Sequence, residues 1–226
     1  MKIVTFNVLH FKNYKTGEID FSKFAGEIKN SGADITGLNE VRGKGLLKDY
    51  TDQLKTVSEL TGQKYYFGKA ISVKGLAPYG NGLLSKYDIT DAKTVKIPDP
   101  DKKTGSEMYE SRSIIKARIR DLTIIVTHMG LNTDERENAV KTILGIAPEE
   151  RCIIMGDFNC PPDAPELSDL FGKFICSDKD AFTFPSDKPQ KKIDYIFVSK
   201  DIKIKSFGTS ENVVSDHLYH YIEIEE

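Results

Sequence analysis

Short apolar segments rich in β-branched residues recur along the whole chain, separated by polar stretches. Alternating or continuous apolar runs of this kind are typical of β-strands. The pattern predicts strands at residues 3–8, 34–39, 65–67, 82–85, 113–119, 122–127, 152–155, 193–198, 202–207 and 218–224.

Apolar residues at helical spacing predict three helices between these strands. In the first, Phe21, Phe24 and Ile28 share one face, and Asp20 precedes them as a candidate N-cap. Glycine ends many helices because it adopts the left-handed conformation easily. The other two stripes each run to a glycine: Leu46, Leu47, Tyr50, Leu54, Val57 and Leu60 to Gly62, and Ala139, Val140, Ile143 and Leu144 to Gly145.

The order of these elements predicts the fold class. The first half alternates strands and helices, whereas the second half is mostly strand. About ten strands are too many for one small sheet, so we expect an α/β (α+β) protein with two sheets packed face to face and helices outside. The polar stretch 97–110 is too short for a linker, and no internal repeat is visible. We therefore expect a single domain over residues 1–226.

Composition and charge exclude several classes of protein. The 226 residues carry 32 Lys and Arg against 34 Asp and Glu, which leaves a formal net charge of −2. This balance excludes a strongly basic nucleic-acid coat, because affinity for the phosphate backbone needs clustered positive charge, but it allows a small basic patch. No apolar run approaches the roughly 20 residues that a membrane helix needs, and no signal peptide is visible. We expect a soluble, cytoplasmic protein.

The three cysteines indicate neither a disulfide framework nor a zinc site. Cys152, Cys160 and Cys176 are odd in number and lack the CxxC spacing that zinc sites use. We expect them to be structural residues.

Polar side chains follow the predicted strands at the points where the strands end. Rigid strand ends can bring such side chains to one rim of a sandwich. Taken singly, Asn7 can bond nearby backbone, and Glu40 can be a solvated strand end. Asp157 can cap a turn, whereas Asp194 enters an apolar strand and therefore needs a histidine or metal partner. The set comprises Asn7, Glu40, His128, Asp157, Asn159, Asp194, Asp216 and His217.

These residue types suit metal-assisted phosphoryl chemistry. Carboxylate and amide oxygens favour Mg²⁺ or Mn²⁺ over zinc. Imidazoles and neutral donors can bind phosphate oxygens, and a His–Asp pair can activate water. Together with a cation they can neutralise the charge of a phosphoryl centre.

Seven short motifs, taken in order, resemble the endonuclease/exonuclease/phosphatase superfamily, which has the deoxyribonuclease-I-like fold. The resemblance covers almost the whole chain and implies a four-layer sandwich of two mixed β-sheets with helices outside. Residues 183–189 are most similar to compact bacterial members described as metal-dependent hydrolases. The motifs are FNV at 6–8, LNEV at 38–41, GNGLLSK at 80–86, THMG at 127–130, GDFN at 156–159, KIDYIFVS at 192–199 and SDH at 215–217.

The resemblance also implies a metal site and a catalytic histidine. Glu40 and Asp216, with Asn7 beside them, correspond to the residues that hold a divalent cation, here Mg²⁺ or Mn²⁺. His217, oriented by Asp194, corresponds to the histidine that polarises the attacking water or stabilises the phosphate.

Four further residues take phosphate-binding or proton-transfer roles by the same resemblance. Asp157 and Asn159 are expected to handle proton transfer and a phosphate oxygen, and Asp157 is either the base or the acid. His128 and Arg112 are expected to contact the scissile phosphate.

The resemblance predicts a Mg²⁺/Mn²⁺-dependent phosphoric ester hydrolase acting on a phosphodiester or phosphomonoester. The alternatives are a DNA or RNA endo- or exonuclease and a catalytically silent binding protein, although no motif residue is missing. Leu218 and Tyr219 follow the SDH motif where many members have a proline two residues on, which weakens assignment to the apurinic-site nucleases or sphingomyelinases. We expect a phosphorylated small molecule or nucleic acid as partner, no stable protein partner, and a monomer.

Substrate choice is expected to depend on two segments, residues 68–80 and 97–110, predicted to be loops. Tyr79 and Tyr109 flank motif loops as exposed aromatic residues that could stack on a base or sugar, although core packing is the more ordinary role. The cluster Lys188, Lys191 and Lys192 either meets a polyanionic substrate or forms a solvated loop.

Overall fold

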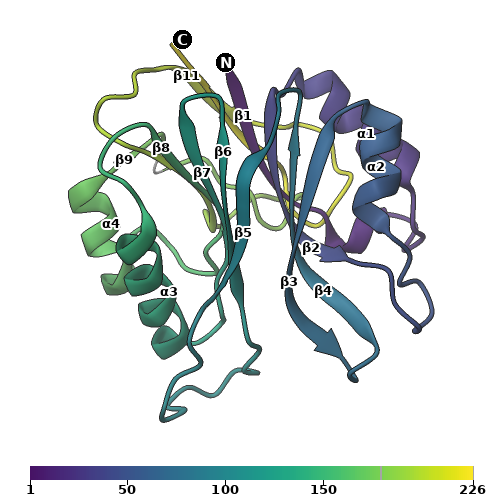
Figure 1. Ribbon diagram of the computed structural model, residues 1–226, viewed down its shortest axis with the longest axis horizontal. Helices are drawn as coiled ribbons and strands as arrows, with labels where there is room; N and C mark the ends of the chain where they lie inside the picture. Colours follow the sequence, from purple (N-terminus) through teal and green to yellow (C-terminus); the bar gives the residue numbers. More distant parts are fainter. Residues whose placement is uncertain (179, 226) are drawn as a thin grey trace.

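Two six-stranded sheets face each other and form the centre of the molecule (Figure 1). The computed structural model describes residues 1–178 and 180–225. The first sheet contains β1 (Lys2–Asn7), β2 (Ile35–Arg42), β3 (Lys64–Val73), β4 (Ala77–Ser85), β11 (Ile204–Thr209) and β12 (His220–Ile224). The second contains β5 (Thr90–Lys96), β6 (Ser113–Ile119), β7 (Leu122–His128), β8 (Cys152–Asp157), β9 (Ile175–Cys176) and β10 (Asp194–Val198).

Each sheet has a parallel pair of strands in its middle. The first sheet has the order β11-β12-β1-β2-β4-β3, and the second has the order β5-β6-β7-β8-β10-β9. The pairs β1–β2 and β7–β8 are parallel, and the other described pairs are antiparallel. Parallel neighbours need a crossover, which α1 (Phe21–Ser31) and α3 (Thr133–Ile146) provide. The carboxyl ends of both parallel pairs carry the motif residues.

Helices cover the outer face of each sheet. In Figure 1, α1 and α2 (Gln53–Thr61) lie over the first sheet, and α3 and α4 (Ser168–Lys173) lie over the second. Ile3 of the first sheet packs with Ile124 and Ile153 of the second in the central core, while Phe24 and Ile143 belong to the two outer cores. The order helix, sheet, sheet, helix confirms the expected four-layer α/β sandwich of two mixed sheets.

The first helix begins where the sequence predicts. The Asp20 side chain accepts a hydrogen bond from the Lys23 N–H, and the helix ends at Gly32, whose φ is +74°. Phe24 and Ile28 face the core, as their spacing predicts.

The other two predicted helices have different boundaries. Helix α2 begins only after Asp52, which caps the Lys55 N–H, so the apolar residues at 46–50 precede the helix. Leu46 is 83% exposed, and its N–H donates to Leu76 instead of to a helical partner. Helix α3 runs through Gly145 to Ile146, because Ala147 stands before Pro148 and is therefore extended.

Several strand predictions were also incomplete. β3 and β4 extend far beyond the predicted segments and form a long hairpin, so residues 68–80 are mostly strand, not a loop. β5, β9 and α4 were not predicted, because β5 is a polar, exposed edge strand and the other two are short. The strands expected from 202 and 218 begin at Ile204 and His220. Within the described residues, no helix is long and apolar enough to cross a membrane.

Candidate active site

The polar residues predicted at strand ends lie together at one rim of the sandwich. Asn7 ends β1 and Glu40 lies near the end of β2, while His128 and Asp157 end β7 and β8. Asp194 opens β10 opposite Asp157. The rim brings together Asn7, Glu40, Arg112, His128, Asp157, Asn159, Asp194, Asp216 and His217 around a cavity of about 790 Å³.

Two buried asparagines tie the sheets together behind this rim. Asn39 Nδ2 donates to the Thr127 carbonyl (2.7 Å) and to Asn81 Oδ1 (2.9 Å). Asn39 Oδ1 accepts from the Asp157 N–H (3.0 Å), and Asn81 Nδ2 donates to the Ser113 carbonyl (2.9 Å). The bonds to Thr127, Ser113 and Asp157 cross from the first sheet to the second, whereas the Asn39–Asn81 bond links the two asparagines within the first sheet. Sequence reasoning assigned neither residue a role, although both stand inside the LNEV and GNGLLSK motifs.

A β-bulge sets the position of Glu40. The register of β2 against β4 shifts between Leu38 and Val41, and Glu40 has a φ of +62°. A bulge of this kind turns a side chain away from its regular alternation. The Glu40 side chain is 21% exposed at the cavity and accepts from Asn7 Nδ2 (3.2 Å). Its pKa is raised by burial, and the nearby Asp216 raises it further.

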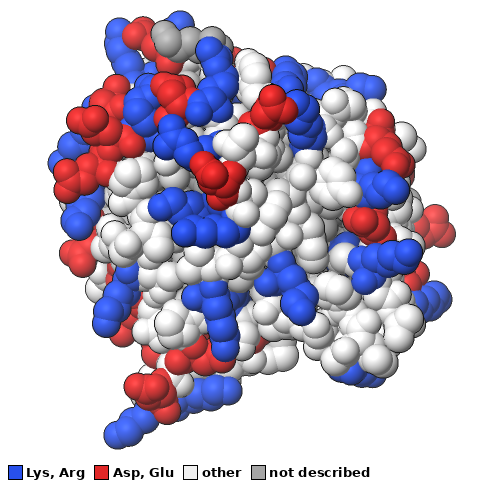
Figure 2. Space-filling model, in the orientation of Figure 1, with Lys and Arg blue, Asp and Glu red and all other residues white. Residues whose placement is uncertain are grey.

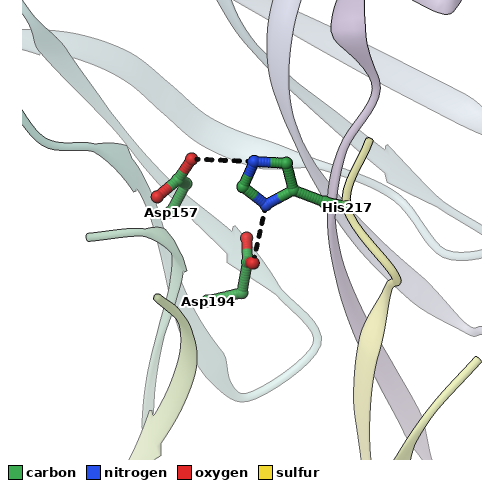
Figure 3. A group of neighbouring side chains, drawn as sticks. All are labelled: Asp157, Asp194 and His217. Carbon is green, nitrogen blue, oxygen red and sulfur yellow. Dashed lines mark hydrogen bonds and ion pairs between the residues drawn. The ribbon is translucent and has the colours of Figure 1, made fainter. Parts of the chain in front are cut away.

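His217 is held by two carboxyl groups of the opposite sheet (Figure 3). Its Nδ1 lies 2.8 Å from Asp194 Oδ2, and its Nε2 lies 3.7 Å from Asp157 Oδ2. A carboxylate only accepts, so Nδ1 carries a proton. Nε2 points toward Asp157, and His217 lines the cavity. Burial alone would lower the pKa of His217, but Asp194, Asp157 and Asp216 raise it to about 10. Asp194 thus has the histidine partner that its apolar surroundings indicated.

His128 is neutral, and its tautomer follows from its neighbour. Arg112 Nη1 lies 2.9 Å from His128 Nδ1, and a guanidinium can only donate. The ring proton therefore sits on Nε2, which lies 3.6 Å from Asp157 Oδ2. Burial and then the Arg112 charge hold the pKa of His128 well below its ordinary value.

Asp157 lies between the two imidazoles. Its Oδ2 accepts from Asn7 Nδ2 (3.0 Å), and its Oδ1 accepts from the Asn159 N–H (2.9 Å). Burial, followed by the charge of Asp194, raises the pKa of Asp157 to about 7. A carboxyl group with such a pKa can take up or release a proton near neutral pH.

The backbone before Asp157 requires glycine. Gly156 has a φ of +148°, and a Cβ at this position would overlap the Thr127 carbonyl oxygen. No L side chain fits such a conformation and approach. The glycine of the GDFN motif therefore allows β8 to lie close beside β7 where both strands reach the rim.

Glu40 and Asp216 fit a divalent cation. They are two carboxyl groups close enough that Asp216 raises the pKa of Glu40, and a cation between them would relieve this repulsion. Their oxygen atoms are the ligands that Mg²⁺ and Mn²⁺ prefer. A second group, Asp157, Asp194 and His217, has ligand atoms within 4.8 Å of one another, but Asp194 already occupies His217 Nδ1.

Asn7 presents its amide N–H groups to the rim. Nδ2 donates to both Glu40 and Asp157, while Oδ1 accepts from the Leu9 N–H (3.2 Å). In this arrangement Asn7 orients the two carboxyl groups, and its assignment as an oxygen ligand stays a prediction.

Two residues at the site were not found from the sequence. His10 Nε2 lies 3.5 Å from Glu40 Oε2, and Thr183 Oγ1 donates to Asp194 Oδ2 (2.6 Å). His10 stands two residues after the FNV motif, which is a usable signal, whereas Thr183 is brought in only by the folding of its loop.

The structure shows how three further residues singled out in the sequence are packed. Tyr79 is 8% exposed and packs edge-on against His10, which confirms the core-packing alternative over an exposed stacking surface. Tyr109 donates to Asp134 Oδ2 (2.7 Å) and holds the loop after β5. Lys192 is 1% exposed, and its Nζ donates to the Asp194 carbonyl (3.1 Å), so it does not belong to a solvated cluster.

The four-layer fold and its rim are those of a class of hydrolases. In this class, acidic residues and histidines meet at the strand ends of two packed sheets. The chain belongs to the Endonuclease/Exonuclease/phosphatase family, whose model matches residues 4–217. The match confirms the resemblance found in the motifs. A comparison with curated proteins found no significant match.

Solved structures support the same fold. An endonuclease/exonuclease/phosphatase from Beutenbergia cavernae DSM 12333 is 17% identical with a TM-score of 0.80, over 100% of this chain and 71% of that chain. A family protein from Leptotrichia buccalis C-1013-b is 23% identical with a TM-score of 0.74, over 100% of both chains. The mannosyl-6-phosphatase Bt3783 of Bacteroides thetaiotaomicron VPI-5482 is 16% identical with a TM-score of 0.77, also over 100% of both chains.

Proposed function

We propose that this protein is a divalent-metal-dependent phosphoesterase that hydrolyses a phosphodiester or phosphomonoester by in-line attack of water. The observation that carries the proposal is the Asp157 carboxyl group between the imidazoles of His128 and His217, at 3.6 Å and 3.7 Å. Two further carboxyl groups, Glu40 and Asp216, line the same cavity. This combination supplies both proton transfer and charge neutralisation to one phosphate.

The buried residues handle protons. Asp194 and Thr183 fix the ring of His217, so that Nε2 can hold a water molecule or a phosphate oxygen. Asp157 has a pKa near 7 and can accept the proton of the attacking water or return one to the leaving oxygen.

Neutral and cationic donors stabilise the phosphate. Arg112 and the Nε2–H of His128 face the cavity, and Asn159 has one amide hydrogen beyond the bond that it donates to the Met129 carbonyl (2.9 Å). Donors placed before the reaction stabilise the charge that develops on the equatorial oxygens.

Glu40 and Asp216 are the residues that would hold Mg²⁺ or Mn²⁺, with Asn7 orienting Glu40. When bound, such a cation neutralises phosphate charge and polarises the phosphorus–oxygen bond.

A modest-sized substrate fits better than a long duplex. Figure 2 shows Lys and Arg mixed with Asp and Glu over one face, with uncharged surface between them. The Bacteroides neighbour is named for a sugar phosphate, which is compatible with a monoester substrate.

A nuclease is the second candidate, because the exposed Lys191 lines the cavity and could contact a neighbouring phosphate. All the site residues predicted from the motifs are present in the chain, which favours an enzyme over a silent binding protein. The cytoplasmic location and the monomeric state stay predictions.

The test is a panel assay with Mg²⁺, with Mn²⁺ and with EDTA, on p-nitrophenyl phosphate, bis-p-nitrophenyl phosphate, sugar phosphates and oligonucleotides. We expect metal-dependent turnover that EDTA abolishes and excess cation restores. His217→Ala should lose at least about 10²-fold in kcat, and circular dichroism should show that the variant is still folded at the assay temperature. Full activity in EDTA or in the His217→Ala variant would contradict the proposal. Steeply salt-dependent binding of oligonucleotides would favour the nuclease.

A further inference from the structure

The cavity beside the rim has a polar floor and an apolar wall. The floor is formed by the residues of the phosphoester site described above. The wall comprises Leu131, Pro161, Pro162, Phe182 and Phe184, and these residues line the same cavity of about 790 Å³ as His217 and Asp157. The phosphoester site therefore continues directly into an apolar surface.

Two large apolar side chains of the wall are exposed. Phe182 is 47% exposed and Leu131 is 40% exposed. Single exposed apolar residues are ordinary, but several around one cavity mark a surface that a ligand can cover. Phe184 joins the wall to the floor, since its ring centroid lies 4.9 Å from that of His217.

The segment that carries the two phenylalanines is tied to the catalytic strands. Thr183 stands between them, bonds Asp194 through its hydroxyl, and accepts from the Leu218 N–H (2.8 Å). Phe184 pairs with Lys191 as an antiparallel bridge. Side chains alternate in extended chain, so Phe182 and Phe184 face the cavity while Thr183 faces Asp194. The aromatic side of the wall is thus held in place before any ligand binds.

The other part of the wall, formed by Leu131, Pro161 and Pro162, is also attached to the site. Leu131 follows the end of β7, where the Met129 N–H donates to the Asp157 carbonyl (2.9 Å). Pro161 and Pro162 follow Asn159, and their rings restrict the backbone there. Both parts of the wall therefore have a set position relative to the phosphoester site.

We propose that this wall binds a planar ring carried by the organic part of the phosphoester substrate, either a simple aryl group or a nucleobase. The inference rests on the proposed function, because the wall adjoins the phosphoester site. A ring placed against Phe182 and Leu131 buries apolar surface and can stack on the phenylalanine. A fully hydroxylated sugar phosphate would leave these side chains without an apolar partner.

Matched ligand pairs test the proposal. The first pair is phenylphosphonate and methylphosphonate, in which a phenyl group replaces a methyl group. The second pair is adenosine 5′-monophosphate and ribose 5-phosphate, in which the nucleobase replaces the anomeric hydroxyl group. Their affinities are measured by calorimetry and as inhibition constants against the best substrate of the panel. In the unmodified protein, the ring-bearing member of at least one pair should bind on the order of tenfold more tightly.

Variants locate that preference on the wall. Phe182→Ala and Leu131→Ala should bring the ratio of affinities toward one and leave binding of methylphosphonate and ribose 5-phosphate unchanged. Phe207→Ala and Leu76→Ala are the matched controls, because these side chains are 49% and 48% exposed and lie outside the cavity lining. Both controls should keep the ratio of the unmodified protein.

The outcomes separate the two proposals. A ratio near one in the unmodified protein, or a preference that survives both wall variants, overturns the ring-binding wall. A preference in the first pair alone identifies an aryl group, and one in the second pair alone identifies a nucleobase; both support the wall. Absence of turnover on every phosphoester contradicts the proposed function instead, and calorimetry still decides whether the wall binds a ring.

Discussion

The two sheets reach the site with the same topology but with different chemistry. In the first sheet, the parallel strands β1 and β2 bring Asn7 and Glu40 to the rim. In the second sheet, the parallel strands β7 and β8 bring His128 and Asp157. One half therefore supplies an amide and a half-buried carboxyl group, and the other half supplies an imidazole and a buried carboxyl group.

The difference shows how burial separates two roles. Asp157 is 2% exposed, and burial raises its pKa to about 7, which suits proton transfer. Glu40 is turned toward the open cavity by the bulge in β2, whereas β8 pairs with β7 and β10 without such a shift in register. An accessible carboxyl group next to Asp216 suits a cation. By our proposal, the strand ends serve proton transfer in one sheet and metal binding in the other.

Asp157→Asn is expected to have the largest effect, because it removes the proton-transferring group of the second sheet while keeping its shape. We expect kcat to fall by about 10³-fold. Raising Mg²⁺ or Mn²⁺ should not restore it. The measurement is steady-state kinetics over a metal titration, and recovery at high metal would show that Asp157 belongs to the cation site.

Glu40→Gln tests the corresponding position of the first sheet. We expect a loss of about 10- to 100-fold at low metal and substantial recovery at high metal, since the variant removes a ligand but no proton-transferring group. Metal-induced thermal stabilisation should weaken in parallel. An unchanged metal response would remove Glu40 from the cation site, and Asp157→Asn, with its normal metal response, is the control.

Asn39→Ala tests the connection between the sheets. It removes the bonds to Thr127 and Asn81 and leaves the buried Asp157 N–H without its acceptor. We expect the free energy of unfolding to fall by about 2–3 kcal/mol, measured by urea denaturation. Thr16→Ala, which loses an exposed hydroxyl bond to Glu18, is the control and should change little. A stability loss no greater than that of the control would show that the Asn39 bonds do not hold the sheets together.

The smallest effect concerns the pH dependence of stability in EDTA. His217 has a pKa of about 10 in the folded protein, above the ordinary value of 6.5, so its stabilising contribution is complete below pH 6.5 and is lost as the pH rises through 10. Between pH 7 and 8, the partial loss of this contribution lowers the free energy of unfolding by at most about 1.4 kcal/mol. His217→Ala should flatten that slope in urea titrations at the two pH values. An equal slope in the variant would assign the pH dependence to other groups.

Local pattern and motif order predicted much of the fold and the composition of the site. The Asp20 cap, both ends of β6 and the start of β8 all depend on residues close in sequence. The start of α2 and the long β3–β4 hairpin were mispredicted, because apolar spacing alone cannot distinguish a packed turn from a helix, nor show how far a strand continues to pair. Lys192 was misassigned since its burial depends on distant elements that cover it.

The order of residues along the chain is enough to show which chemical groups stand at the strand ends: carboxyl groups, amides and imidazoles. Which of these groups meet depends on the tertiary structure. It placed Thr183 on Asp194, Arg112 on His128 and Asn39 across the two sheets. The physical reason is that tautomers and pKa values depend on distance and on exclusion of water. Both arise from contacts between residues that are often far apart along the chain.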